Sequence, residues 1–220
     1  MTTKMIAMTA LTALVLLSLG CGKSASDAIA DTSAQTSNKT TADGNAAIQD
    51  ATYTSPCTSS TIPDVGPIKF PGMQTFFELS DYQFTKHVVY FSDADCKIAA
   101  FDVRETGNVH VVGKSAAVAG ALGEDFNYTN TNITIQNDLV LAAFNAASAC
   151  GINDWAKATA RDTSAQSGSG LCPGKASPRK AADVVLVQNG NQLFLGAGAD
   201  QDAATPRPTA VDNAHGFLKQ

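Results

Sequence analysis

Cys21 is the residue whose sequence context most directly indicates a chemical modification. Lys4 gives the start of the chain a positive charge, and an uncharged apolar run follows from Ile6 to Leu19. That run of about fourteen residues is too short for a membrane-spanning helix, which needs about twenty, but it has the length of a secretory signal. The segment Ser18-Leu19-Gly20 brings small residues to the position just before Cys21. We therefore predict a signal peptide over residues 1–20, with the Cys21 thiol available for attachment of a lipid.

The residues from Ser18 to Cys21 resemble the bacterial lipobox, at which a diacylglycerol is joined to the cysteine thiol and the new N-terminus is acylated, for example with palmitate. Several acyl chains together hold a protein firmly on a membrane. The expected localisation is the bacterial outer membrane, on its periplasmic or surface face, with the membrane as a partner through the lipid anchor. An ordinary secretory signal that happens to precede a cysteine is the alternative.

Four further cysteines follow in a chain that the signal directs to an oxidising compartment: Cys57, Cys96, Cys150 and Cys172. Two disulfides are expected there. Four cysteines allow three connectivities, and we favour Cys57 with Cys96 and Cys150 with Cys172 because both pairs close modest loops. A zinc site is the competing interpretation, but no CxxC pair exists and the histidines lie far from the cysteines in sequence.

No nucleophile, metalloprotease or phosphate-binding motif stands out, so we expect neither an enzyme nor a cofactor. Asp93 with Asp95, and Asp200 with Asp202, have the spacing of a calcium loop, but neither pair is followed by the glycine and glutamate of an EF-hand. Turn capping by short polar side chains is the preferred interpretation of both pairs. No metal site is predicted.

The charge of the chain argues against nucleic acid as a partner. Lys and Arg number 15, Asp and Glu number 20, the formal net charge is −5, and the basic residues are scattered. A nucleic-acid-binding protein would show a basic patch or stripe. One local basic cluster, Lys175, Arg179 and Lys180, is expected to be a solvated loop.

Composition divides the chain after the signal into three segments. Residues 21–54 are rich in small and polar residues and have no aromatic residue before Tyr53, so they cannot bury enough apolar surface to offset their conformational entropy. We expect a disordered tether there. Residues 55–198 are expected to form one β-barrel domain, and the polar, proline-containing residues 199–220 a C-terminal tail over its surface.

Short β-like runs separated by turn residues fill the predicted domain, which is the pattern of a mainly β, antiparallel barrel or sandwich. The expected strands are 76–79, 86–91, 96–103, 108–112, 132–136, 184–187 and 193–195. Asn137-Asp138 is expected to cap one short helix that carries Leu141 and Phe144 on one side and ends at Cys150-Gly151. Asn189-Gly190 between two apolar runs predicts a closing hairpin.

Several groups of residues, in this order and spacing, are similar to one known domain: Tyr90 to Cys96, Gly113-Lys114-Ser115, Val118 to Ala121, Asp125-Phe126, Phe144-Asn145, Cys150 to Trp155, and Leu193 to Gly196. They resemble the domain of the adenomatosis-polyposis-coli-down-regulated Wnt antagonists and their single-domain bacterial lipoprotein relatives. The likeness covers roughly residues 75–198. Animal members carry two copies and a membrane anchor, so their Wnt role does not transfer to this chain.

The resemblance implies a single lipocalin-like barrel with an apolar pocket, and a function in binding a lipid or a small hydrophobic ligand. From the large residues of the domain we select Phe101, Phe126 and Trp155 as candidates for the pocket wall. Core packing beside a disulfide is the preferred alternative for Trp155. The alternative function is a non-catalytic structural or adhesion module at the cell envelope, in which the barrel is solid and its loops meet a protein.

Overall fold

Strands are the predominant secondary structure in the described part of the chain. The computed structural model describes residues 50–166, 172–198 and 206–220, all within one unit of the chain, Asn38–Gln220. The strands are β1 (Ala51–Thr54), β2 (Thr58–Ser59), β3 (Gly72–Ser80), β4 (Gln83–Phe91), β5 (Ala99–Lys114), β6 (Leu122–Ile135), β7 (Arg161–Asp162), β8 (Arg179–Gln188), β9 (Gln192–Phe194) and β10 (Phe217–Lys219). Cys21, the predicted signal peptide and nearly all of the predicted tether lie outside the described residues.

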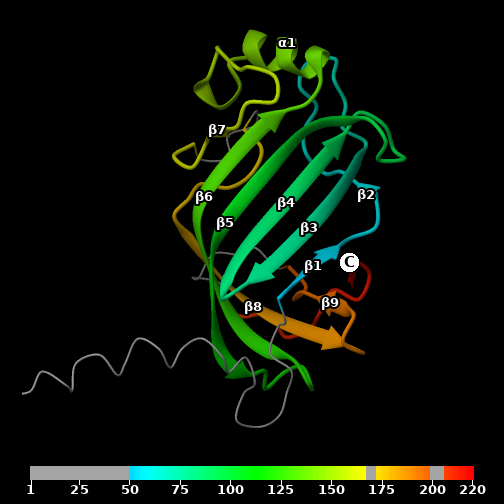
Figure 1. Cartoon of the computed structure of the whole chain (residues 1–220), viewed down its shortest axis with the longest axis vertical. Coiled ribbons are helices and arrows are strands. Elements are labelled where there is room, and N and C mark those ends of the chain that lie inside the picture. The colour runs from blue at the N-terminus through cyan, green and yellow to red at the C-terminus, as the bar shows by residue number, and fades with distance from the viewer. Residues whose placement is uncertain (1–49, 167–171, 199–205) are drawn as a thin grey trace, which may run out of the picture. The chain divides into compact units, whose positions relative to one another are not determined.

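Eight of these strands close into an antiparallel barrel. The order around it is β1, β10, β9, β8, β6, β5, β4 and β3, and β3 pairs with β1 to complete the ring. The short strands β2 and β7 are not members of this ring; β2 pairs with β3, and β7 pairs with β6. Figure 1 shows the long strands β3 to β6 running side by side, with α1 at one end. The predicted mainly β, antiparallel, lipocalin-like barrel with one short helix is confirmed, and a sandwich is excluded.

Two tight hairpins set the register of neighbouring strands. Asp81 and Tyr82 join β3 to β4 with φ angles of 48° and 60°. Residues 189–191 join β8 to β9, and the first two of them, Asn189 and Gly190, have φ angles of 51° and 70°. Two consecutive left-handed residues are typical of the turns whose twist matches that of antiparallel strands. The hairpin predicted from Asn189-Gly190 is therefore confirmed.

The strands expected at 96–103 and 108–112 are in fact one long strand, β5. The chain does not turn between the two expected strands; at Thr106-Gly107 the pairing of β5 with β6 shifts its register instead. A Cβ atom on Gly107 would lie 2.0 Å from the Asn127 carbonyl oxygen. The absence of a side chain at Gly107 therefore allows β5 and β6 to approach each other closely. Glycine within a strand marks such irregularities as well as turns.

The predicted domain boundaries, 55 and 198, are wrong at both ends. β1 and β10 lie outside them, yet each is a member of the barrel. Tyr53 pairs with Phe77 on β3 and with Lys219 on β10, and Phe217 pairs with Leu193 on β9. Both strands are too short to give a pattern of their own, and they are stabilised by partners far away in sequence. The barrel spans Ala51–Lys219.

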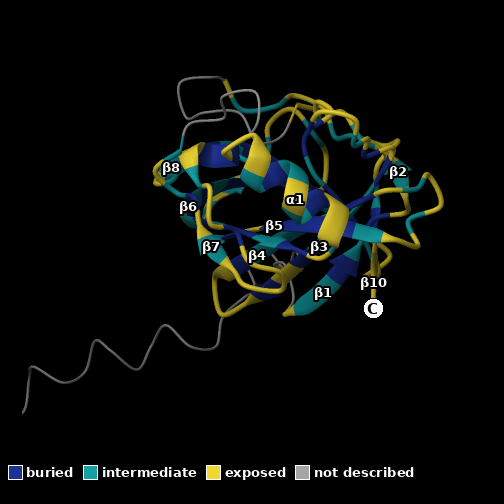
Figure 2. Ribbon diagram, turned by 90° about the horizontal axis from the view of Figure 1, so that it is seen from above, coloured by how far each residue is buried: buried dark blue, intermediate teal, exposed yellow. Residues whose placement is uncertain are grey.

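The buried apolar residues form two clusters. The first, the eight-strand cluster, receives a side chain from every strand of the ring: Tyr53, Phe77, Leu79, Phe84, Val109, Phe126, Tyr128, Ala181, Val185, Leu193 and Phe217. The second, the helix cluster, lies at the other end of the strands β4, β5 and β6, where they contact α1 and the loops around it. Its members are Val65, Phe70, Val88, Tyr90, Ala100, Phe101, Val103, Ile133, Ile135, Val140, Phe144, Ala149, Cys150, Trp155 and Cys172. In Figure 2, α1 lies across the strands seen from above.

The helix α1 (Asp138–Ala146) begins where the sequence predicts. The Asn137 side chain accepts a hydrogen bond from the Leu139 backbone N–H at 2.9 Å and so caps the first turn. Its buried face carries Val140 and Phe144, whereas Leu141 is only half-buried. The helix ends before the expected Cys150-Gly151, which instead belongs to a 3-10 turn at Ala149–Gly151.

Candidate functional site in the barrel interior

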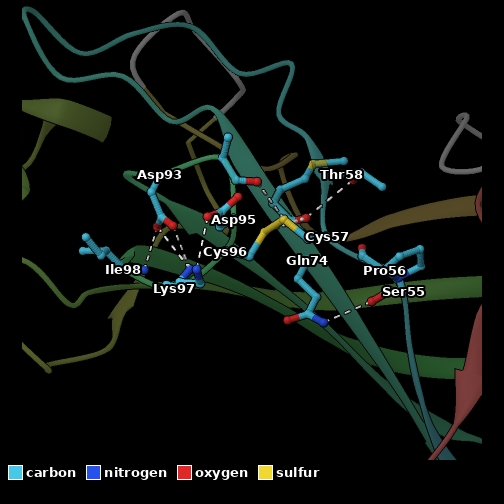
Figure 3. The surroundings of a disulfide bond; sticks show 12 residues. Ser55, Pro56, Cys57, Thr58, Gln74, Asp93, Asp95, Cys96, Lys97 and Ile98 are labelled. Atoms are coloured by element: carbon cyan, nitrogen blue, oxygen red, sulfur yellow. Dashed lines mark hydrogen bonds and ion pairs between the residues drawn. A yellow bond between two sulfur atoms is a disulfide. The ribbon is translucent and has the colours of Figure 1, made fainter.

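The two disulfides have the pairing that the sequence analysis favoured. Cys57 is bonded to Cys96, and Cys150 to Cys172. Figure 3 shows the first of them, which ties the segment after β1 to the turn between β4 and β5. The second ties the 3-10 turn beyond α1 to the loop that precedes β8, and both of its cysteines are buried in the helix cluster. Together they fasten irregular segments to the barrel.

Asp93 caps the turn between β4 and β5, as predicted. Its carboxylate accepts hydrogen bonds from the backbone N–H groups of Lys97 at 3.1 Å and Ile98 at 2.7 Å (Figure 3). The Ile98 bond is the largest cause that holds the Asp93 pKa below its usual value. Asp95 forms an exposed ion pair with Lys97. Asp200 and Asp202 lie outside the described residues.

The three predicted pocket residues lie in two different clusters. Phe101 and Trp155 belong to the helix cluster and Phe126 to the eight-strand cluster. Phe144 stands between the first two, with its ring centroid 5.3 Å from that of Phe101 and 5.6 Å from that of Trp155. The Trp155 indole donates a hydrogen bond to the Ala149 carbonyl at 3.1 Å, so Trp155 packs beside the Cys150–Cys172 disulfide. Of the three, only Phe126 lies on β6, the strand that also carries the buried Glu124.

Buried charged residues lie in the interior between the two clusters. Arg179 on β8 donates to Glu105 on β5 at 2.8 Å, and both side chains are less than a tenth exposed. The Lys86 ammonium on β4 is 3.7 Å from the other oxygen of Glu105. The Arg179 guanidinium also stacks on Tyr128, with 3.4 Å between its central carbon and the ring centroid. The expectation that Arg179 belongs to a solvated loop is therefore wrong.

Glu124 on β6 is the most unusual polar residue of the barrel. It is completely buried, and neither carboxyl oxygen has a hydrogen-bond partner among the described residues. Burial alternates along this part of β6, so that Glu124 shares a face with Leu122, Phe126 and Tyr128. Because Phe126 and Tyr128 are members of the eight-strand cluster, Glu124 faces the barrel interior.

Asp183 on β8 is paired directly with Glu124 and is 3% exposed. One of its oxygens accepts hydrogen bonds from the backbone N–H groups of Val184 at 2.6 Å and Gly196 at 2.8 Å. A Cβ on Gly196 would lie 2.5 Å from that oxygen, so only glycine permits this approach. Hydrogen bonds from backbone N–H groups favour the charged form of a carboxylate.

Arg207 lies on the other side of the same two strands. Its guanidinium donates to the backbone carbonyls of Glu124, at 2.5 Å, and of Asp183, and forms an ion pair with Asp125. Asp125 alternates with Glu124 along β6 and so belongs to the outer face. Arg207 thus binds the strands through their backbone without donating to the Glu124 carboxyl.

Burial, together with the charge of Asp183, raises the Glu124 pKa from 4.5 to about 8, against a smaller opposite effect of Arg207. At neutral pH the group is a neutral carboxyl that can donate one hydrogen bond and accept others. Such a carboxyl can form a hydrogen bond with a polar atom of a ligand that is otherwise surrounded by apolar side chains. The described residues contain no group of three or more His, Cys, Asp or Glu placed to hold a metal ion. They also contain no helix long and apolar enough to cross a membrane.

A separate hollow of about 360 Å³ lies at the end of β3 and β4 beside Gly107. Its wall is largely polar: Glu78, Ser80, Gln83, Phe84, Thr85, Thr106, Gly107, Asn108 and Thr129. The three predicted pocket residues do not line it. The hollow has no buried side chain that lacks a partner, so the interior around Glu124 is the stronger candidate site.

Glu124 and Arg179 were missed by the sequence analysis because a charged residue in a strand is usually solvent-facing. One signal was present. In the segment 179–185, Arg179 and Asp183 occupy the same alternate positions as the apolar Ala181 and Val185. That register places both charges on the core face. Searches against protein-family models and against curated proteins find no match for this chain.

Proposed function

We propose that this protein is a lipoprotein of the bacterial outer membrane, anchored through Cys21, whose barrel binds a lipid or small hydrophobic ligand that carries one polar group. The Lys4 charge, the apolar run Ile6–Leu19 and Cys21 support the anchor. A closed eight-stranded barrel is large enough to hold one small ligand. The resemblance to the lipid-binding Wnt-antagonist domain supports the same function.

The observation that carries the proposal is the Glu124 carboxyl. A buried polar group without a hydrogen-bond partner costs about 1–3 kcal/mol, and native structures retain few of them. Glu124 has two such oxygens on the interior face of the barrel, beside Leu122 and Phe126. A ligand that brings a polar atom to Glu124 and apolar groups to its neighbours would offset that cost.

Native mass spectrometry tests the proposal on the full chain with Cys21→Ser, exported and purified without detergent. Each methylene buried in the barrel contributes roughly 0.8 kcal/mol, so a ligand with an alkyl chain should survive purification. We expect a discrete mass above that of the polypeptide, released by organic extraction. A bare polypeptide mass, together with no binding of an uncharged fluorescent alkyl probe at micromolar concentration, would overturn the proposal and favour the structural or adhesion module.

A further inference from the structure

The hollow beside Gly107 opens on the outer face of the barrel. Burial alternates along β3 and β4, so that Leu79 and Phe84 face the interior while Glu78 and Thr85 face outward. The hollow has a volume of about 360 Å³, which is within the range of small-molecule sites. It is therefore a site separate from the barrel interior, and its ligand can be inferred from its wall.

Strand pairing arranges six of the lining residues in two rows of three across β3, β4 and β5. The first row is Glu78, Thr85 and Thr106, and the second is Ser80, Gln83 and Asn108. Side chains directly opposite each other on neighbouring strands are about 5 Å apart, and two rows two residues apart along a strand are separated by about 7 Å. Hydroxyl groups around a sugar ring have comparable spacings.

The floor between the two rows is held by the barrel. It consists of Phe84 and Gly107, which are paired across β4 and β5. The Phe84 ring packs edge-on against Tyr128 in the eight-strand cluster, with 4.8 Å between the ring centroids. The Val109 backbone N–H donates to the Tyr82 carbonyl at 2.8 Å and fastens the hairpin between β3 and β4 to β5. The two rows are thus carried by a fixed part of the fold.

A β-bulge adds Thr129 to the wall. Thr106 pairs with Asn130 and Gly107 pairs with Tyr128, so Thr129 is the extra residue on β6. Bulges re-aim side chains and are frequent beside functional sites. The Thr129 hydroxyl donates to the Thr106 carbonyl at 3.1 Å, which leaves its oxygen as an acceptor toward the hollow that it lines.

The wall combines donors and acceptors with a single charge. The Asn127 side chain donates to the Asn108 side-chain oxygen at 2.9 Å, so Asn108 presents its own NH₂ group. Glu78 supplies carboxylate oxygens and is the only charged residue among the described residues that line the hollow. Arg104, the next outward residue of β5 beyond Thr106, is exposed and does not line it.

We propose that this hollow binds a neutral saccharide unit through hydrogen bonds to its hydroxyl groups. A hydroxyl both donates and accepts, as this wall requires. An apolar ligand would bury the polar wall without partners, which is costly. An anion would be repelled by Glu78, and one carboxylate is too few for a hard metal ion, which takes six or more oxygens. The inference goes beyond the proposed function and does not depend on it.

Two-dimensional ¹⁵N–¹H NMR of the full Cys21→Ser chain tests the inference. Glucose, galactose, mannose and N-acetylglucosamine are each titrated at millimolar concentration. We expect at least one of them to shift the signals of Gln83, Gly107 and Asn108 in a saturable way and to leave Leu139 on α1 unchanged. The anionic counterparts glucuronate, galacturonate, mannuronate and N-acetylmuramate are titrated in the same way. The counterpart of the preferred sugar should bind about two- to fivefold more weakly, because its carboxylate meets Glu78 at an exposed site.

The variants identify the residues responsible. Thr85→Val and Thr106→Val each remove one hydroxyl and should weaken binding of the preferred sugar about two- to tenfold, the contribution of one hydrogen bond. Two such variants are used so that one misfolded protein does not decide the result. Glu78→Gln should narrow the difference between the neutral sugar and its anionic counterpart. Thr159→Val, at an exposed threonine outside the hollow, should leave both affinities unchanged.

The possible outcomes are distinct. If none of the four neutral sugars shifts the signals of the hollow, the saccharide inference is overturned, and the proposed function of the barrel interior still stands. Equal or tighter binding of the anionic counterpart would also overturn it, as would an affinity that Thr85→Val and Thr106→Val both leave unchanged.

Discussion

Glu124 on β6 and Asp183 on β8 are paired directly across two strands of the barrel, and both side chains are almost completely buried. Asp183 is stabilised by two backbone N–H groups, whereas neither Glu124 oxygen has a hydrogen-bond partner among the described residues. Two adjacent buried carboxyls cannot both ionise without a large electrostatic cost. Burial, together with the charge of Asp183, therefore raises the Glu124 pKa and favours the protonated form of Glu124.

Glu124→Gln should change how stability depends on pH. The Glu124 pKa is about 8 in the folded chain, against 4.5 for an unperturbed glutamate. Between these values the unfolded chain releases a proton that the folded chain retains, so stability falls as pH rises from 4.5 toward 8. The loss is on the order of 5 kcal/mol when complete. Urea unfolding at several pH values should show a smaller fall for the variant than for the wild type.

The matched control is Glu78→Gln, at an exposed position on β3. Its stability should follow the wild-type pH dependence. If Glu124→Gln also follows it, Glu124 is ionised in the native barrel and the description of the site is incorrect.

Arg179→Met should destabilise the barrel by about 3–5 kcal/mol, because it leaves Glu105 buried without its closest cation. Methionine retains most of the apolar volume, so the effect reports the lost charge and hydrogen bonds. Lys97→Met, which breaks an ion pair whose two side chains are about three-quarters exposed, should change stability by less than about 1 kcal/mol. Equal unfolding midpoints for the two variants would show that Arg179 is solvated.

Phe217→Ala should destabilise the chain by about 3–5 kcal/mol, because Phe217 brings β10 into the eight-strand cluster. Its neighbour Leu218 is 53% exposed, so Leu218→Ala should have a small effect, within about 0.5 kcal/mol. Thermal unfolding of the two variants checks the role of β10. Similar melting temperatures for the two variants would mean that β10 is not part of the barrel in solution.

The four cysteines of the barrel should not react with a thiol reagent in denaturant unless reductant is added. Loop-closure entropy predicts a loss of about 4 kcal/mol when Cys57 and Cys96 are both replaced by Ser, and about 3 kcal/mol for Cys150 and Cys172, since the first pair is separated by 39 residues and the second by 22. Chemical denaturation measures both losses. Labelling of two or more thiols in the oxidised protein would contradict the pairing.

Cys21→Ser should move the protein from the membrane fraction to the soluble envelope fraction, because lipidation of Cys21 is the proposed anchor. Cell fractionation followed by detergent-phase partitioning measures the change. A Cys21→Ser protein that still partitions into detergent would show that another part of the chain holds it on the membrane.

The antiparallel barrel could be predicted because its long strands carry local signals. Short β-like runs marked the strands that became β3, β4 and β6, and Asn189-Gly190 marked a hairpin. The strands β1 and β10 could not be predicted in this way, since their stability comes from pairing between residues such as Tyr53 and Lys219, at opposite ends of the barrel sequence. The same limitation produced the error at Gly107, where a glycine accommodates a neighbouring strand instead of forming a turn.

The candidate site was harder to predict than the fold. Large aromatic residues were the natural choice for a ligand pocket, yet Phe101 and Trp155 pack in the helix cluster and Phe126 alone lies near Glu124 in sequence and on the same face. The polar residues that distinguish the interior resemble surface residues in a sequence. Their burial depends on strand register, which the pairing of β6 with β8 determines.

Methyl NMR of the Cys21→Ser chain, titrated with a dodecyl ligand, tests most directly the central claim that the barrel binds a small molecule in its interior. Ala181, Val185 and Leu193 are methyl-bearing members of the eight-strand cluster, and Leu139 on α1 is an exposed control. The account predicts that the interior methyl signals shift and show contacts to the alkyl chain, while Leu139 is unchanged. Unchanged interior methyl signals at saturating ligand, or shifts confined to exposed methyl groups, would contradict it.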